Sequence, residues 1–227
     1  MMTSLTAAQQ NEVVRSFIAR SYSWMAAGLV LTAGVAALTA SNISMMHSVQ
    51  TALPLLMLMQ LGIVMGLSFL ADRINAALAG LLFMVYAGLT GLTFSGLLLA
   101  FGPAVTGTTF LITAGTFGAM SAVGYFTKRD LSGMSGFLTF ALIGLLLAMV
   151  VNMFLGNGLM TMVISGVGVL LFAALTAYDT QKLREMALSG LEGEMAERGA
   201  VHGALTLYLD FINMFLFILR LIGGGRD

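Results

Sequence analysis

The chain has 227 residues and no net charge, with 59% apolar and only 9% charged residues. Because a soluble domain carries about 25% charged residues, this composition excludes an ordinary soluble protein and predicts one embedded in a membrane. Cysteine is absent, which excludes disulfide and thiol chemistry. The sequence has no basic patch interleaved with aromatic residues, so nucleic acid is not an expected partner.

Seven apolar segments are each long enough to cross a bilayer as a helix of about 20 residues. In chain order they are Tyr22–Ala40, Ala52–Ala71, Ala76–Ala100, Thr106–Phe126, Gly136–Leu155, Leu159–Asp179 and Ala204–Ile222. They take up nearly the whole chain, and none has the alternating pattern of barrel strands. The predicted fold is therefore an all-α integral membrane protein, a bundle of seven transmembrane helices.

The expected organisation is one membrane domain with short ends. Residues 1–20 form a polar N-terminal segment, residues 21–223 the seven-helix membrane domain, and residues 224–227 a short tail. The N-terminal segment has no small-residue cleavage site after an apolar core, so we expect a lead-in to the first helix rather than a signal peptide.

Basic residues occur mainly in alternate connections between the apolar segments. They are Arg15 and Arg20 before the first segment, Arg73 after the second, Lys128 and Arg129 after the fourth, and Lys182, Arg184 and Arg198 after the sixth. The positive-inside rule therefore predicts that the N-terminus and these connections are cytoplasmic. Arg220 and Arg226 depart from the pattern, so two arrangements of the last helix stay open, one that spans the membrane and one that re-enters it.

Two aspartates lie inside these apolar segments. A carboxylate in hydrocarbon costs roughly 2.5 kcal/mol or more, so such a residue usually faces a bundle interior and marks an ion or proton site. Asp179 ends the sixth segment, and Asp210 lies on the order of 10 Å into the seventh, at a rise of about 1.5 Å per residue. Because the two segments are antiparallel, we expect both side chains at a similar depth.

Three further polar residues are expected to support this pair. Arg73 lies on the same predicted side of the membrane, and an arginine nearby would favour ionised carboxylates and latch the helices together. Asn213 lies one turn beyond Asp210 on the same helical face, and Tyr178 directly precedes Asp179.

Two carboxylates close together in a low-dielectric site do not both ionise readily, so they share a proton and titrate as a unit. Such a pair can sense pH, bind a divalent cation when ionised, or carry out aspartyl-protease chemistry. Calcium usually takes about six to eight oxygen ligands, so Asp179 and Asp210 predict only a weak transit site for this ion.

Enzymatic activity is not expected. Intramembrane aspartyl proteases carry a Gly-x-Gly-Asp motif, whereas Tyr208 and Leu209 precede Asp210. The two histidines, His47 in a predicted outer loop and His202 at the start of the seventh segment, fall on opposite predicted sides of the membrane and cannot share a metal. No cofactor is expected.

Three stretches carry a family resemblance: Gly88–Thr93, Ala177–Gln181, and Leu207–Arg220 with Asp210 inside it. They are similar to the third-helix glycine pattern, the end of the sixth helix and the last helix of the Bax inhibitor-1 family, also called transmembrane Bax inhibitor motif proteins. The likeness covers essentially all seven segments and is most specific in the last two.

The resemblance implies a seven-helix calcium leak channel with the last helix central. It implies that Asp179 and Asp210 form a pH-sensitive pair and that Arg73 latches the closed form. The connection Glu185–Ala200 looks longer than in the compact bacterial members, which leaves open its role as a cytoplasmic lid. Some bacterial relatives instead bind and restrain a membrane-anchored protease.

The expected function is therefore a pH-sensitive calcium leak channel, with calcium as a permeant or transiently bound ion. The alternative is a non-conducting membrane partner that modulates a membrane-anchored protease or another channel. Expected partners are membrane lipid and calcium, and in the alternative a membrane protease. A monomer fits the sequence, and the absence of organelle-targeting signals favours the bacterial cytoplasmic (inner) membrane. The physiological ion and the conducting pH state stay open.

Overall fold

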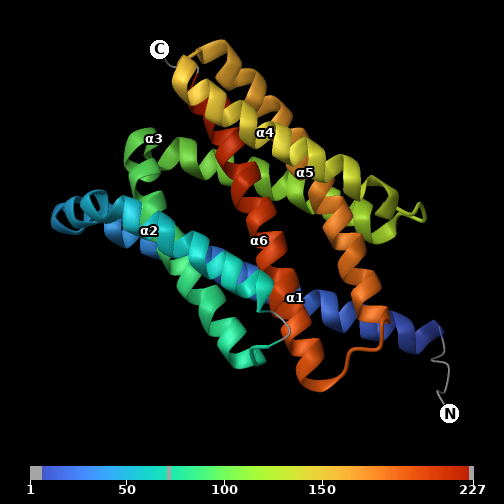
Figure 1. Ribbon diagram of the computed structural model, residues 1–227. Helices are drawn as coiled ribbons and strands as arrows, with labels where there is room; N and C mark the ends of the chain where they lie inside the picture. Colours follow the sequence, from blue (N-terminus) through green and yellow to red (C-terminus); the bar gives the residue numbers. More distant parts are fainter. Residues whose placement is uncertain (1–6, 71–72, 225–227) are drawn as a thin grey trace. The chain divides into compact units, whose positions relative to one another are not determined.

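The computed structural model describes residues 7–70 and 73–224. Residues 1–6 of the predicted N-terminal segment, the predicted helix end at Ala71, and residues 225–227 of the predicted tail, with Arg226, lie outside the described residues. Within the described ranges the chain forms six α-helices, one short 3-10 helix and no β-strand (Figure 1). The predicted all-helical class is confirmed.

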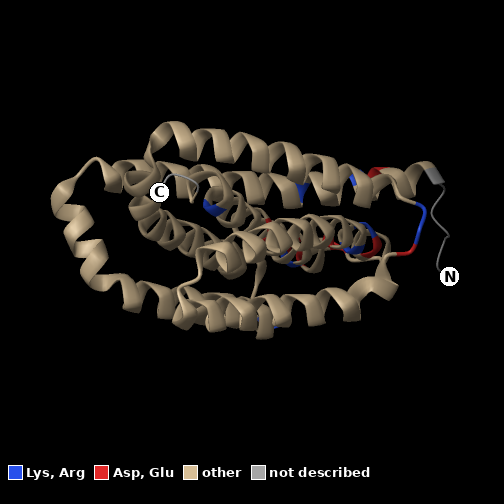
Figure 2. Cartoon of the chain, turned by 90° about the horizontal axis from the view of Figure 1, so that it is seen from above, with Lys and Arg blue, Asp and Glu red and all other residues tan. Residues whose placement is uncertain are grey.

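All six α-helices are long and apolar enough to cross a membrane, judged by length and composition. Most of the helical ribbon is free of charged residues (Figure 2). In chain order the elements are α1 (Ala7–Ala40), α2 (Ile43–Phe69), α3 (Ala76–Phe126), η1 (Ser132–Met134), α4 (Ser135–Leu155), α5 (Gly158–Leu188) and α6 (Gly193–Gly223).

The longest helix, α3, covers both the third and the fourth predicted segments. Gly102 inside it has a non-helical backbone, with φ 77° and ψ 160°, and Pro103 follows directly. Only glycine adopts such a positive φ without strain, and proline has no N–H to continue the helical hydrogen bonds. Gly102 and Pro103 thus divide the 51 residues of α3 into two helical parts, and the division falls between the third and the fourth predicted segments. The described residues contain six helices, and the seven-span arrangement stays a prediction.

The predicted outer loop around His47 is wrong, because α2 already begins at Ile43 and includes His47. Asn42 caps this helix, and its side-chain oxygen accepts a hydrogen bond from the Met45 N–H at 3.1 Å. Such a cap satisfies one of the N–H groups that have no partner within the helix.

The predicted helices on either side of the connection between α5 and α6 are also too short. Helix α5 continues beyond Asp179 to Leu188, and α6 begins at Gly193 rather than at Ala204. The connection Glu185–Ala200 is therefore mostly helical, with a short turn that contains Gly190 at φ 80°. Hydropathy marks the apolar part of a helix, whereas the hydrogen-bonded helix itself continues into polar sequence.

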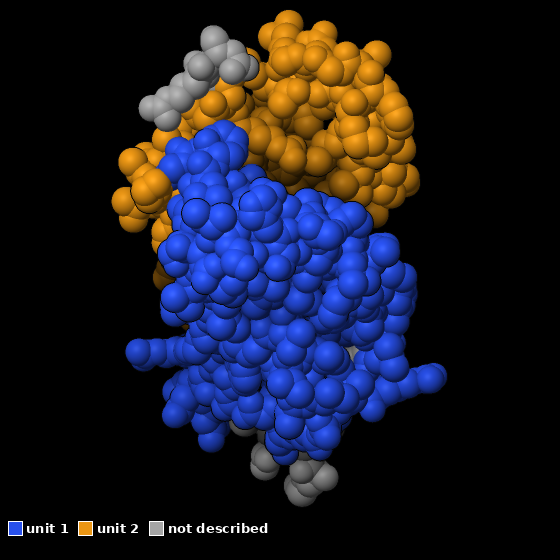
Figure 3. All heavy atoms as spheres, turned by 90° about the vertical axis from the view of Figure 1, so that its left-hand side faces the viewer, with its two compact units in different colours: residues 1–102, 183–208 blue, residues 103–182, 209–227 orange. Residues whose placement is uncertain are grey.

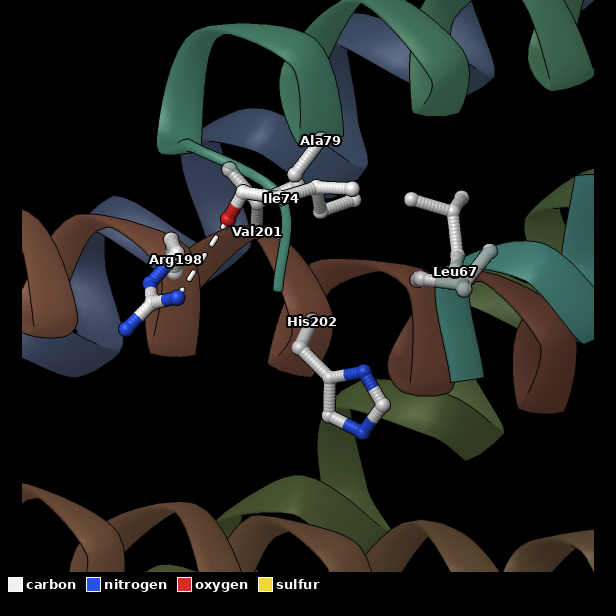
Figure 4. A pocket seen from close by; sticks show the side chains of 7 residues that line it. Leu67, Ile74, Ala79, Arg198, Val201 and His202 are labelled. Atoms are coloured by element: carbon white, nitrogen blue, oxygen red, sulfur yellow. Dashed lines mark hydrogen bonds between the residues drawn. The ribbon is translucent and has the colours of Figure 1, made fainter. Parts of the chain in front are cut away.

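The chain divides into two compact units, coloured separately in Figure 3. The first comprises residues 1–102 and 183–208, and the second comprises residues 103–182 and 209–227. The division passes through α3, α5 and α6, so each of these helices contributes to both units. The predicted single membrane domain stays a prediction.

Tyr208 of α6 is the centre of the core of the first unit. It is fully buried, and its ring meets Phe83 and Tyr86 edge-on, with centroids 5.5 and 5.8 Å away. Its hydroxyl lies 2.6 Å from Oγ1 of Thr32, which is also 2.9 Å from the carbonyl oxygen of Ala87. Because Thr32 has one hydroxyl proton and bonds to the carbonyl with it, the Tyr208 hydroxyl is the donor between the two side chains.

Two phenylalanines of α6 organise the core of the second unit. Phe211 contacts Phe110 and Phe117 of α3, with ring centroids 5.4 and 5.5 Å apart. Phe217 stacks on Phe172 of α5 at 5.8 Å. Among the six long helices of the described residues, α6 is the most buried, since 61% of its apolar membrane-spanning stretch is buried inside the protein.

Candidate functional site

The carboxyl groups of Asp179 and Asp210 lie within hydrogen-bonding reach of each other in the second unit. Asp210 is only 5% exposed, and Asp179 is half-buried. Apart from the carboxyl group of Asp179, the buried Oδ2 atom of Asp210 has no hydrogen-bond partner among the described residues. The structure thus brings together the two aspartates that the sequence singled out.

This contact requires a proton. Carboxylate oxygens only accept hydrogen bonds, so two carboxyl groups can bond to each other only when one of them is protonated. Two ionised groups at this place would repel each other in a site that water does not reach on the Asp210 side. Lys182 lies one helical turn farther along α5, and its positive charge attracts the carboxylate of Asp179. The pair is therefore built to hold one shared proton.

Before Asp179, the backbones of α5 and α3 are in direct contact. Gly124 of α3 faces Ala177 of α5, and a Cβ atom at Gly124 would lie 2.9 Å from both the Cα and the carbonyl carbon of Ala177. Real Cβ atoms essentially never approach another atom so closely. Only glycine lets the two helices meet at this distance, two residues before the buried acid.

Beyond Asp179, the side chain of Gln181 ties α5 to the chain between α3 and η1. Its Nε2 donates to the carbonyl oxygen of Arg129 at 2.9 Å, and its Oε1 accepts from the N–H of Leu131 at 2.7 Å. Gln181 is only 7% exposed. The turn of α5 that carries Asp179 is thus held on both sides, by Gly124 and by Gln181.

The predicted supporting residues have separate roles. The Nδ2 atom of Asn213 donates to the carbonyl oxygen of Leu209 at 2.8 Å, a bond within α6. Tyr178 is half-buried beside Asp179. Arg73 belongs to the first unit, where it is exposed in the turn after α2, and its N–H donates to the carbonyl oxygen of Leu70 at 2.9 Å. Its role as a latch stays a prediction.

Metal binding has little support from side chains. In the part of the chain that the structure describes, no three or more His, Cys, Asp or Glu residues come together to hold a metal ion. The two carboxyl groups offer fewer oxygens than the about six to eight that calcium takes, so backbone carbonyls or water would have to complete its shell. The weak calcium transit site at Asp179 and Asp210 stays a prediction.

Gln181 and Gly124 were not predicted as site residues. Gln181 is the last residue of the stretch Ala177–Gln181 that resembles the family, and this position was the one signal in the sequence that pointed to it. Its partners are backbone atoms of a connection some fifty residues earlier, and backbone partners leave no pattern of side chains. Gly124 is one of 27 glycines, and composition does not tell a close helix contact from an open one.

Helices that can cross a membrane, with a pair of carboxyl groups in contact between two of them, define a polytopic membrane protein. Residues 14–227 match the family model described as "Inhibitor of apoptosis-promoting Bax1". The chain belongs to this family, the Bax inhibitor-1 family, so the resemblance to this family is confirmed.

Several bacterial proteins are similar to the chain over nearly its whole length. An uncharacterized protein of Deinococcus radiodurans is 55% identical over 99% of this chain and 96% of its own. The inner membrane protein YbhL of Escherichia coli is 42% identical over 94% of this chain and 93% of its own. An uncharacterized protein of Borreliella burgdorferi is 36% identical over the full length of both chains. The helices and these relatives together support an integral inner membrane protein.

Proposed function

We propose that this protein is a pH-sensitive cation leak channel of the bacterial inner membrane, with calcium as the permeant ion and the Asp179–Asp210 pair as its pH sensor. The observation that carries the proposal is the contact between the two carboxyl groups, of which that of Asp210 is almost fully buried. Buried acids inside membrane helices usually mark an ion or proton path. No catalytic activity and no cofactor are proposed.

In this proposal the shared proton controls the distance between α5 and α6. While the pair holds the proton, the two carboxyl groups bond and the helices stay together. When the pH rises and the proton leaves, two negative charges repel each other or accept a passing cation, and the preferred conformation changes. The size of this change depends on the free-energy difference between the two conformations. The high burial of α6 fits a central helix whose movement would open a path.

Two further parts of the proposal come from the sequence. The distribution of basic residues supports a cytoplasmic N-terminus. The family resemblance supports seven spans, with the kink at Gly102 as the break between the third and the fourth, and a latch at Arg73 that steadies the closed state. The effect of Arg73→Ala on flux tests the latch directly.

The test is calcium flux into liposomes that contain the purified protein, measured between about pH 5 and pH 8. Wild type is compared with Asp179→Asn and Asp210→Asn, in which an amide keeps the shape and a permanent N–H donor replaces the shared proton. Glu192→Gln is the matched control, because it also removes one carboxylate but at an exposed position in the turn before α6.

We expect wild-type flux to depend on pH, each asparagine variant to flatten that dependence, and Glu192→Gln to keep it. If wild type carries no flux above empty liposomes at any pH, conduction is wrong. The alternative of a non-conducting partner of a membrane protease or another channel then becomes the better explanation. Pull-down from a membrane extract would test it, since the alternative predicts that the asparagine variants still bind while changes in residues 1–20 abolish binding.

A further inference from the structure

A cavity of about 350 Å³ lies in the second unit, where α4 ends, α5 begins and α6 ends. Its walls are formed by Asn152, Thr161 and Arg220 together with the apolar side chains of Met149, Met153 and Ile164. Pockets for small ligands begin at about 300 Å³ and combine apolar walls with a few polar groups. The cavity has this composition, and neither the acid pair nor the proposed conduction uses it.

The orientation of the Asn152 amide is determined by its neighbour. The hydroxyl of Thr161 donates its single proton to the carbonyl oxygen of Asn157 at 3.0 Å, so toward Asn152 this hydroxyl can only accept. The group of Asn152 that lies 2.7 Å from it is therefore the amide nitrogen. The amide oxygen, Oδ1, is consequently the buried acceptor without a hydrogen-bond partner in the described residues. Such an acceptor calls for a donor.

Arg220 adds a positive charge to the same cavity. Its guanidinium lies 5.7 Å from the ring centroid of Phe217, and no carboxylate is among the residues that line the cavity. Arg220 is also one of the two arginines that depart from the charge pattern of the connections. A guanidinium is the side-chain group best suited to bind a phosphate through two parallel hydrogen bonds.

We propose that this cavity binds the headgroup of a phospholipid that carries an N–H donor, as a phosphoethanolamine headgroup does. Arg220 binds the phosphodiester, and the ammonium group donates to Oδ1 of Asn152. The acyl chains continue along the lipid-facing side of α4, where Val150 and Met153 are 52% and 72% exposed. The three helices all have an end at the cavity, and helix ends in a membrane protein lie at the level of the headgroups.

The apolar part of the site favours a lipid over free phosphate. Met149, Met153 and Ile164 are among the residues that line the cavity, and a soluble phosphate would leave these apolar side chains without a partner. An amphiphile covers both kinds of wall at once. Arg220 alone would attract any phosphate at the membrane surface, so the specific claim rests on the second contact, at Asn152.

Native mass spectrometry of the full-length protein in detergent tests the proposal, by titration with phosphatidylethanolamine or phosphatidylcholine of identical acyl chains. Both lipids carry the phosphodiester, but only the first has N–H donors. We expect about tenfold tighter binding of phosphatidylethanolamine, the effect of one hydrogen bond from a charged donor. Asn152→Leu should lower this binding to the level of phosphatidylcholine, and Arg220→Gln should weaken both lipids by about tenfold.

Lys128→Gln is the control, because it removes an exposed cation of the same unit that does not line the cavity. The proposal would be overturned if wild type bound the two lipids equally well. It would also be overturned if Arg220→Gln weakened lipid binding no more than Lys128→Gln does. Displacement of the lipid by equal concentrations of glycerophosphoethanolamine would also overturn it, since a soluble headgroup would then suffice. If Asn152→Leu does not fold, the same question is tested on the wild-type protein with lipids whose amine carries one, two or three methyl groups. We expect the tenfold preference to disappear when the last N–H is replaced by a methyl group.

Discussion

Gly124 and Ala177 place the backbones of α3 and α5 in direct contact, because a Cβ on Gly124 would lie 2.9 Å from the Cα of Ala177. The obstacle is backbone rather than a flexible side chain, so it cannot move aside without displacing a helix. We predict that Gly124→Ala lowers the free energy of unfolding by about 1–3 kcal/mol, the usual cost of overpacking. Thermal unfolding in detergent measures it.

Gly118→Ala is the matched control for this variant. Gly118 lies in the same helix, and a Cβ there would meet no atom within 4 Å. An alanine at Gly118 should leave stability unchanged or raise it slightly, because alanine favours the helix over glycine. Equal effects of the two substitutions would contradict the close contact.

Gln181→Leu removes both hydrogen bonds that join α5 to the connection before η1. The carbonyl of Arg129 and the N–H of Leu131 then lose their partners, at a cost of roughly 1–3 kcal/mol for each group that stays buried. We expect faster hydrogen exchange at Leu131 and a lower unfolding temperature. Gln50→Leu, at an exposed glutamine, is the control. Unchanged exchange at Leu131 would show that its N–H does not depend on Gln181.

Tyr208→Phe tests the buried hydroxyl in the first unit. The ring contacts with Phe83 and Tyr86 remain, and the hydroxyl's hydrogen bond to Thr32 and its contact with Thr90 are lost. We predict a loss of about 0.5–1.5 kcal/mol in the free energy of unfolding, the net value of one hydrogen bond. Tyr125→Phe serves as control, since that side chain is part-exposed. The prediction fails if both variants unfold at the same temperature.

Asp130 lies outside the membrane-spanning helices, and its ionisation makes the stability of the fold depend on pH. The hydroxyl and the N–H of Ser132 both donate to its carboxylate, which lowers the pKa of Asp130 from its ordinary value. Because the pKa is lower in the folded protein, these two bonds stabilise the fold at any pH above the ordinary aspartate pKa. This stabilisation is lost as the pH falls through the lowered pKa of the folded state. Ser132→Ala keeps only the N–H bond, so the pKa of Asp130 should rise toward normal.

Carbon-13 NMR of the Asp130 carboxyl group between about pH 2 and pH 6 measures this change. Ser135→Ala provides the control, because Ser135 begins α4 and neither of the two hydrogen bonds to the Asp130 carboxylate comes from it. A pKa of Asp130 that is the same in wild type and in Ser132→Ala would contradict the role of the hydroxyl.

The sequence by itself determined the class of protein and the identity of the acid pair. Long apolar segments can only be helices in a membrane, because each backbone polar group must find its partner within the segment. Asp179 and Asp210 stand out for the same reason, since a charge inside such a segment is costly and therefore rarely accidental. The break at Gly102–Pro103 falls between the third and the fourth predicted segments, and both residues disfavour a continuous helix.

Only the tertiary structure decided where the helices end and which distant groups meet. Hydropathy reports the solvent around a segment rather than its hydrogen bonds, so it missed the polar start of α6 before Ala204 and the end of α5 after Asp179. The contact of Asp179 with Asp210, the bonds of Gln181 to a distant backbone, and the cavity between Asn152 and Arg220 join residues far apart in the chain. Such contacts depend on how whole helices pack, and packing follows from the fit of many side chains together, which no local pattern specifies.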